Sequence, residues 1–252
     1  MIRRALAAAA LILAGAAAAV ADEVRVFAAG ATMAALEDVA PVFEQRTGHR
    51  LRANFDTVGA LRDRVLAGEN PDVVLLSAPA LDALATAGRL AAGTRRDLGR
   101  TGVGLAAPLG APPLDISTPD RLRAVLLAAP SLAYADPARG ATAGTHFRKV
   151  LAELGIADAV AAHAKVVPFG VDGVRAVAEG EFALAVSMAT EILANRRVRF
   201  VGNLPEPLQL WTVYGAAAVA PASGATGATA ALLEFLAGET ATEAFRRIGF
   251  AR

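Results

Sequence analysis

Apolar residues alternate along the chain between short unbroken runs and runs that repeat every three or four positions. In the first third, residues 24–28 and 51–55 are predicted as strands, and the apolar run at residues 73–76 is typical of a buried parallel strand. Between them, helical spacing extends from Gly30 to Gly48 and from Gly59 to Gly68. This order of strand, helix, strand, helix and strand predicts a right-handed, doubly wound parallel sheet.

The same alternation restarts after residue 100, and a Pro-rich segment at residues 108–113 lies within it. Apolar runs predict strands at residues 103–107, 131–135, 165–167, 182–186, 197–201 and 208–219. Helical spacing covers residues 118–128, 146–154, 171–178, 227–236 and 241–248. The pattern therefore predicts an α/β protein of two lobes, each built on a doubly wound sheet, with a cleft between them.

The N-terminal segment, residues 1–21, has the pattern of a secretory signal peptide. Two arginines precede an uncharged run of Ala, Leu, Ile and Gly, and Ala19 to Ala21 supply small residues for cleavage after Ala21. An uncleaved membrane anchor is the alternative, but the run is short for a span of about 20 residues. Cleavage leaves 231 residues with a net charge of −1. We expect a periplasmic protein.

A second uncharged stretch, residues 207–233, is long enough to cross a bilayer. Pro221 and several glycines interrupt it, which disfavours a membrane span. We therefore expect no stable membrane insertion once the signal peptide is removed.

The composition excludes several kinds of site. The chain has no cysteine and three histidines, so a disulfide scaffold, a zinc-thiolate site, an iron-sulfur cluster and a thiol nucleophile are ruled out. A formal net charge of +1 without basic blocks argues against a nucleic-acid partner. No Ser-His-Asp order, metal-ligand cluster or phosphate loop stands out, and no cofactor is expected.

Small residues gather where predicted strands end and helices begin. Helix N-termini direct backbone N–H groups outward, and small side chains let a ligand approach them, so several such junctions facing one cleft predict an anion site. Small residues are also ordinary turn and cap residues, and a single junction is weak evidence. The candidate ligand-binding residues are Gly30, Ala31, Thr32, Thr57, Val58, Ser77, Arg139, Thr142, Ala143, Val171 and Met188.

Segments spread over the mature chain resemble the periplasmic molybdate-binding proteins, type II periplasmic binding proteins that serve ABC importers. They are residues 26–30, 48–51, 55–62, 67–68, 72–77, 135–137, 143–155 and 245–250. The resemblance implies a two-lobed fold with lobe one at residues 22–107 plus 206–252, lobe two at residues 108–205, and two crossover strands as the hinge. It also implies the membrane subunits of an ABC importer as partner.

The resemblance further implies an oxyanion site built from hydroxyls and amides at these junctions. The molybdate binders carry two serines and a tyrosine where this chain has Ala31, Val58 and Met188. Thr32 and Thr57 are adjacent and supply substitute hydroxyls for the serines, whereas the tyrosine has no replacement at its position. Because a dehydrated dianion needs nearly every oxygen satisfied, we expect molybdate to bind poorly.

Residues 201–205, 208–209 and 212–214, with Glu191 after Thr190, are similar to a branch of the same family that includes aconitate isomerase. That similarity implies a cleft that binds a tricarboxylate and moves a proton along its allylic system.

The candidate residues for such chemistry are few. His146 is a candidate proton carrier and Arg139 a candidate carboxylate clamp, although both are also consistent with ordinary surface positions. Asp56 is a candidate base or a helix cap, and strand alternation allows Trp211 or Tyr214 to line the cleft. His49 and His163 are expected at the surface.

Together these features predict an extracytoplasmic solute-binding protein that captures a small anion, an oxyanion or an organic carboxylate, between its lobes for an ABC importer. The alternative is an aconitate-isomerase-like enzyme that uses the same cleft.

Overall fold

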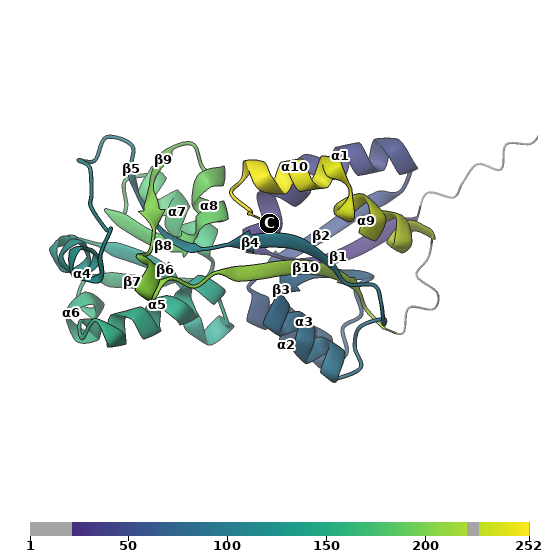
Figure 1. The fold of residues 1–252 in the computed structure, drawn as a ribbon, viewed down its shortest axis with the longest axis horizontal. Helices are drawn as coiled ribbons and strands as arrows, with labels where there is room; N and C mark the ends of the chain where they lie inside the picture. The colour runs from purple at the N-terminus through teal and green to yellow at the C-terminus, as the bar shows by residue number, and fades with distance from the viewer. Residues whose placement is uncertain (1–21, 221–226, 252) are drawn as a thin grey trace, which may run out of the picture.

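The computed structural model describes residues 22–220 and 227–251, so the predicted signal peptide lies outside the described residues. Two five-stranded sheets form two lobes side by side (Figure 1). The strand orders are β2-β1-β3-β10-β4 and β7-β6-β8-β5-β9. The two sheets share one arrangement: β1 pairs in parallel with both β2 and β3 in the first sheet, and β6 pairs in parallel with both β7 and β8 in the second. Helices cover both sheets, as the alternating pattern predicted.

Lobe one combines the start and the end of the chain. Its strands are β1 (Glu23–Ala29), β2 (Arg50–Asp56), β3 (Val73–Ser77), β4 (Arg96–Thr101) and β10 (Thr212–Ala218). Its helices are the short η1 (Gly30–Thr32), α1 (Met33–Thr47), α2 (Val58–Leu66), α3 (Ala78–Thr86), α9 (Gly227–Ala237) and α10 (Glu239–Arg247). The five residues of β3 are all buried, because this strand lies in the middle of the sheet with helices on both faces.

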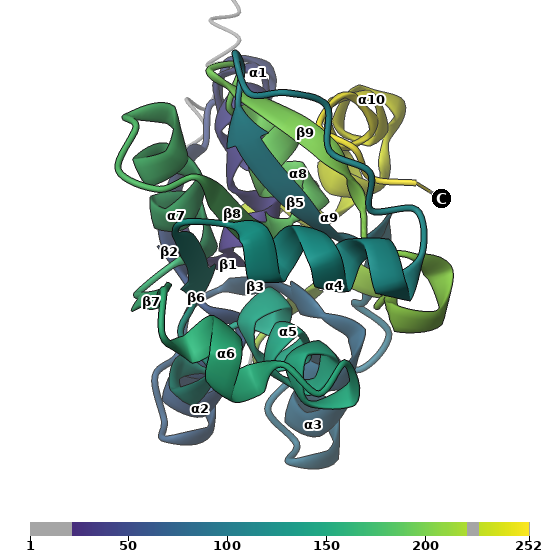
Figure 2. The ribbon, with the colours of Figure 1, turned by 90° about the vertical axis from the view of Figure 1, so that its left-hand side faces the viewer.

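Lobe two is formed by the central part of the chain, and Figure 2 views it from the front. Its strands are β5 (Val103–Pro108), β6 (Leu132–Ala135), β7 (Ala164–Val167), β8 (Leu184–Met188) and β9 (Val198–Asn203). Its helices are α4 (Pro119–Ala128), η2 (Pro137–Arg139), α5 (Thr142–Glu153), α6 (Ala157–Ala161), α7 (Gly170–Ala178) and α8 (Ala189–Ala194), and η3 (Glu206–Leu208) follows β9. Phe147 on α5 is fully buried and packs edge-on against Tyr134 of β6, with the ring centroids 5.3 Å apart.

The chain crosses between the lobes twice, from β4 to β5 and from β9 to β10 (Figure 1). Gln209 joins the two crossings: its Oε1 accepts from the Val103 backbone N at 3.0 Å, and its Nε2 donates to the Val103 O at 3.0 Å. Residues 102–103 and 204–211 therefore form a tied hinge between the sheets.

The structure corrects the predicted boundary between the lobes. The sequence placed residues 103–107 in lobe one and began lobe two at residue 108. Strand β5 pairs with β8 and β9 of the second sheet, so the first crossing occurs at Gly102. No helix of the described ranges is long and apolar enough to traverse a bilayer.

Candidate functional site

A small cavity of about 40 Å³ lies between the lobes, where five strand-to-helix junctions meet. Lobe one supplies the end of β1 with η1, the end of β2 with α2, and Tyr214 of β10; lobe two supplies the ends of β6, β7 and β8 with the helices that follow them. The lining residues are Ala29, Gly30, Ala31, Asp56, Thr57, Val58, Ala135, Ala141, Thr142, Ala143, Phe169, Gly170, Met188, Glu191 and Tyr214. The first N–H groups of α2, α5 and α7 have no acceptor within their own helices, so the arrangement suits an anion.

Seven of the candidate ligand-binding residues line this cavity. They are Gly30, Ala31, Thr57, Val58, Thr142, Ala143 and Met188. The junctions converge because parallel strands with the same winding place their carboxyl ends, and the helix starts that follow, at one edge of each sheet.

Three other candidates do not line the cavity. The Thr32 side chain is fully buried, and its Oγ1 donates to the Ala29 O at 2.8 Å, so it does not substitute for a missing serine. Ser77 pairs with Tyr214 across β3 and β10, and the tyrosine takes the lining position at that edge. Val171 lines an outer groove on the other side of Glu191.

Arg139 ties the lobes together and does not line the cavity. Its guanidinium lies 2.8 Å from the Asp56 carboxylate and over the Phe169 ring at 5.1 Å, and its backbone O accepts from the Thr57 hydroxyl at 2.5 Å. The neighbouring Gly59 N donates to the Gly140 O at 3.1 Å. We refer to this set of contacts between α2 and η2 as the latch. Asp56 lines the cavity but already accepts from Arg139 and from the Thr57 N.

His146 lies outside the cavity on α5. Its Nε2 is 2.8 Å from the Leu208 O, so the imidazole binds the crossover segment that leads to β10. A proton carrier must reach the ligand, and the imidazole is held by the hinge instead. His146, the predicted proton carrier, therefore makes a contact with the hinge and not with the cavity.

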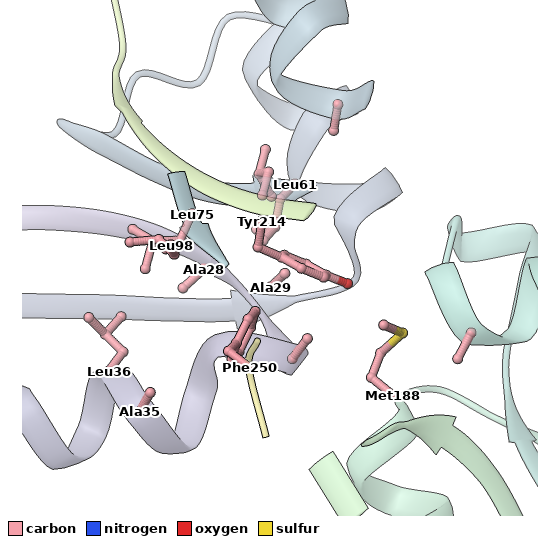
Figure 3. Close-up of a cluster of buried hydrophobic side chains, with 14 of the residues drawn as sticks. Ala28, Ala29, Ala35, Leu36, Leu61, Leu75, Leu98, Met188, Tyr214 and Phe250 are labelled. Carbon is pink, nitrogen blue, oxygen red and sulfur yellow. The ribbon is translucent and has the colours of Figure 1, made fainter. Parts of the chain in front are cut away.

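Of the two aromatic candidates, Tyr214 lines the cavity, whereas Trp211 is 39% exposed and lies against Arg100. The Tyr214 ring packs edge-on against Phe250, with the centroids 5.8 Å apart. Figure 3 shows its hydroxyl leaving this cluster on the side of Met188, and the hydroxyl is hydrogen-bonded to the Thr142 side chain of the other lobe. Burial raises the pKa of Tyr214, so it stays a neutral hydrogen-bonding group.

Glu191 is the lining residue that sequence reasoning did not single out for chemistry. It stands at the third position of α8, where its carboxyl accepts from the Met188 N at 3.3 Å and bonds the Ser187 hydroxyl. Burial raises the pKa of this carboxyl, the two hydrogen bonds oppose that rise, and the charge of Asp172 adds to it. The cavity lining therefore contains two carboxyl groups, Asp56 paired with Arg139 and Glu191 outside any ion pair of the described residues.

Comparison with known proteins assigns the fold to a family. A sequence profile described as bacterial extracellular solute-binding protein matches residues 24–251. The chain belongs to this family. Over 230 residues it is 32% identical to an aconitate isomerase from Pseudomonas sp, covering 89% of this chain and 86% of that protein.

Two molybdate-binding proteins are also similar. The molybdate-binding protein ModA of Escherichia coli K12 is 28% identical over 248 residues, which cover 96% of this chain and 95% of that one. The periplasmic molybdate-binding protein of Azotobacter vinelandii superposes with a TM-score of 0.77 at 17% identity, covering 91% of this chain and 99% of that chain. The expected type II periplasmic binding protein fold is confirmed. Among the described residues, no group of His, Asp and Glu is placed to hold a metal ion.

Proposed function

We propose that the protein is an extracytoplasmic solute-binding protein that captures a small organic carboxylate between its lobes. The observation that carries this proposal is the convergence of helix starts from both lobes on one cavity. A ligand held there bridges the lobes and favours the closed arrangement, which an ABC importer would receive at the membrane. Family membership and the N-terminal signal pattern support export from the cytoplasm.

A carboxylate suits the cavity better than a tetrahedral oxyanion such as molybdate. Ala31, Val58 and Met188 place apolar side chains at three of the junctions, so hydroxyl donors are scarce. Glu191 would repel a dianion when ionised, and when protonated it provides a single hydrogen-bond donor. A carboxylate group offers two oxygens and one charge, which the helix N–H groups with Thr142 can satisfy.

Thermal unfolding and titration calorimetry of residues 22–252 with trans-aconitate, citrate, succinate, sulfate and molybdate test this proposal. We expect saturable binding of one or more of the carboxylates, and a rise in melting temperature with ligand concentration. Thr142→Val should weaken that binding about 5- to 20-fold through loss of one hydrogen bond, and Thr94→Val, far from the cleft, should leave it unchanged. Tight binding of molybdate with no binding of the carboxylates would refute the proposal.

A second candidate function is isomerisation of an unsaturated tricarboxylate, as the alternative from the sequence holds. The observation that favours it is the 32% identity to an aconitate isomerase over 89% of the chain, together with a carboxylic acid in the cavity. Incubation with trans-aconitate, followed by proton NMR, distinguishes the two. Conversion to the cis isomer would show that the protein is an isomerase. Saturable binding without conversion would support the capture function only.

A further inference from the structure

Glu191 lies in the wall between two hollows. One is the 40 Å³ cavity, and the other is an open groove of about 630 Å³ between α1 of lobe one and α7 and α8 of lobe two. Gly30, Ala31 and Glu191 line both. A ligand larger than the cavity would therefore extend past the Glu191 carboxyl into the groove.

The size of the cavity limits what it can enclose. Because one buried water needs about 10–15 Å³ of such space, 40 Å³ accommodates a group of about three heavy atoms. A carboxylate group has that size, and the rest of a polycarboxylate does not fit. With one carboxylate against the helix N-termini, the carbon atoms next to it lie beside Glu191.

The Glu191 carboxyl is held in a slot between the lobes. A Cβ atom added at Gly30 or at Gly170 would collide with the carboxyl oxygens, so glycine at both positions leaves room for the acid. Ser187 and the Met188 N–H fix its orientation from β8 and the start of α8. This arrangement presents a single acid at a defined place beside the ligand.

The charges around Glu191 keep its proton affinity high. Asp172 on α7 adds negative charge, and the nearby Arg175 is engaged by Asp172 at 3.5 Å and by Glu179 at 3.2 Å. Tyr214 on β10 is neutral, and none of the ion pairs among the described residues includes Glu191. Burial and Asp172 thus raise the pKa of Glu191 from its ordinary value near 4.5, in the direction that suits an acid-base catalyst at neutral pH.

We propose that Glu191 is the catalytic proton carrier of an allylic proton shift on an unsaturated polycarboxylate bound with one carboxylate in the cavity. This inference rests on the isomerase function proposed above. It replaces the expectation that His146 carries the proton, since that imidazole binds the Leu208 O.

The shift needs no other reactant. The ionised Glu191 carboxylate takes a proton from the CH₂ group of a CH₂–C=C unit, and the C–H electron pair becomes a new double bond to the central carbon. The electrons of the old double bond move to the far carbon, which takes the proton back from Glu191. The enzyme ends as it began, and the conformation about the CH₂–C bond at the moment the proton leaves sets the geometry of the new double bond.

Negative charge spreads onto the carboxylate in the cavity during the shift. The N–H groups at the start of α5 and the neutral Tyr214 hydroxyl face that position, and such fixed donors stabilise the charge as it develops. Glu191 therefore moves the proton, and the cavity lining stabilises the intermediate.

The test uses residues 22–252 with trans-aconitate in D₂O, with Glu191→Gln and the matched control Glu153→Gln, an exposed glutamate on α5. Proton NMR measures deuterium incorporation and isomerisation, and calorimetry measures binding. We expect Glu191→Gln to lower the rate at least 100-fold while the dissociation constant changes less than about tenfold. The control should keep the wild-type rate.

A pH profile gives a second readout. The wild-type rate should rise with pH as Glu191 loses its proton. Ser187→Ala removes a hydrogen bond that lowers the pKa of Glu191, so the rise should move to higher pH.

Each outcome separates the inference from the function. Retention of the wild-type rate within tenfold in Glu191→Gln would overturn the role of Glu191 and leave the isomerase function standing. Binding by the wild type without deuterium incorporation would overturn both the inference and the isomerase function while leaving capture intact. Failure of the wild type to bind trans-aconitate would overturn both the inference and the isomerase function, and failure to bind any of the carboxylates would overturn the capture proposal as well.

Discussion

Gly59 is the position where one methyl group tests closure of the lobes most sharply. Gly59 lies in the first turn of α2, and a Cβ added there would stand 2.6 Å from the Gly140 Cα and 2.9 Å from the Arg139 O of the other lobe. These are backbone atoms, which cannot turn aside as a side chain would. Gly59→Ala should therefore widen the separation of the lobes at the latch by about 0.8 Å relative to the structure.

We expect Gly59→Ala to weaken ligand binding without lowering the stability of the fold. Overpacking of this kind costs about 1–3 kcal/mol, which is roughly 5- to 150-fold in affinity. The open form has no clash, and alanine restricts the unfolded chain more than glycine does, so the melting temperature without ligand should stay level or rise. Calorimetry with trans-aconitate measures the affinity, and circular dichroism follows the melting.

Gly227→Ala is the matched control. Gly227 begins α9 in the same lobe, and no atom lies within 4 Å of a Cβ added there. Its affinity for trans-aconitate should equal that of the wild type. An affinity of Gly59→Ala within twofold of the wild type would refute the reasoning, because the bound state would not then contain the latch as the structure has it.

Three further predictions concern the hinge, the cavity lining and the acid. Gln209→Ala removes both bonds to Val103 and should lower the free energy of unfolding by about 1–3 kcal/mol; an unchanged melting temperature would contradict the tied hinge. Tyr214→Phe keeps the packing against Phe250 and removes the cavity hydroxyl, so trans-aconitate affinity should fall about 5- to 20-fold with little change in melting temperature, and unaltered affinity would exclude the hydroxyl from the site. Glu191 keeps its proton in the folded chain above its ordinary pKa near 4.5, so the folded state binds more protons than the unfolded chain and the free energy of unfolding should fall as pH rises above about 4.5. Urea unfolding at several pH values should show that this free energy depends less steeply on pH in Glu191→Gln than in the wild type. Equal slopes in the two proteins would contradict the raised pKa.

Hydrophobic pattern was sufficient to predict most of the fold. The mostly buried strands β1, β3, β5 and β8 are rich in apolar residues, and all were expected within two residues of their observed bounds. Strand β4 was missed because Arg96–Thr101 (RDLGRT) has no apolar run, and as an edge strand it buries only Leu98 and Thr101. Helix α3 was given no range: Ser77 to Pro79 were expected only as a junction between a strand and a helix, and the proline occupies the first turn of the helix.

The candidate site was predictable where it depends on local structure. Junctions that follow strands can be located from sequence, and seven of the eleven candidate residues chosen from them line the cavity. Sequence analysis left Tyr214 and Trp211 as alternatives for the cleft. Alternation along a strand predicts which residues share a face, but it does not predict which face meets the other lobe. Glu191 entered the sequence analysis only through the similarity to the aconitate isomerase branch, and no role was predicted for it. It lies in a six-residue helix, and its surroundings depend on Gly30 and Gly170, which are distant in sequence.

The central claim is that one ligand contacts junctions of both lobes in the cavity, and hydrogen exchange of the backbone amides with and without saturating trans-aconitate tests it most directly. We predict slower exchange in residues 29–33 and 56–60 of lobe one together with residues 141–145 and 169–172 of lobe two, because a ligand bound between these junctions holds the lobes closed over them. Protection confined to one lobe, or centred on the separate hollow between α10 and Leu98, would contradict the account.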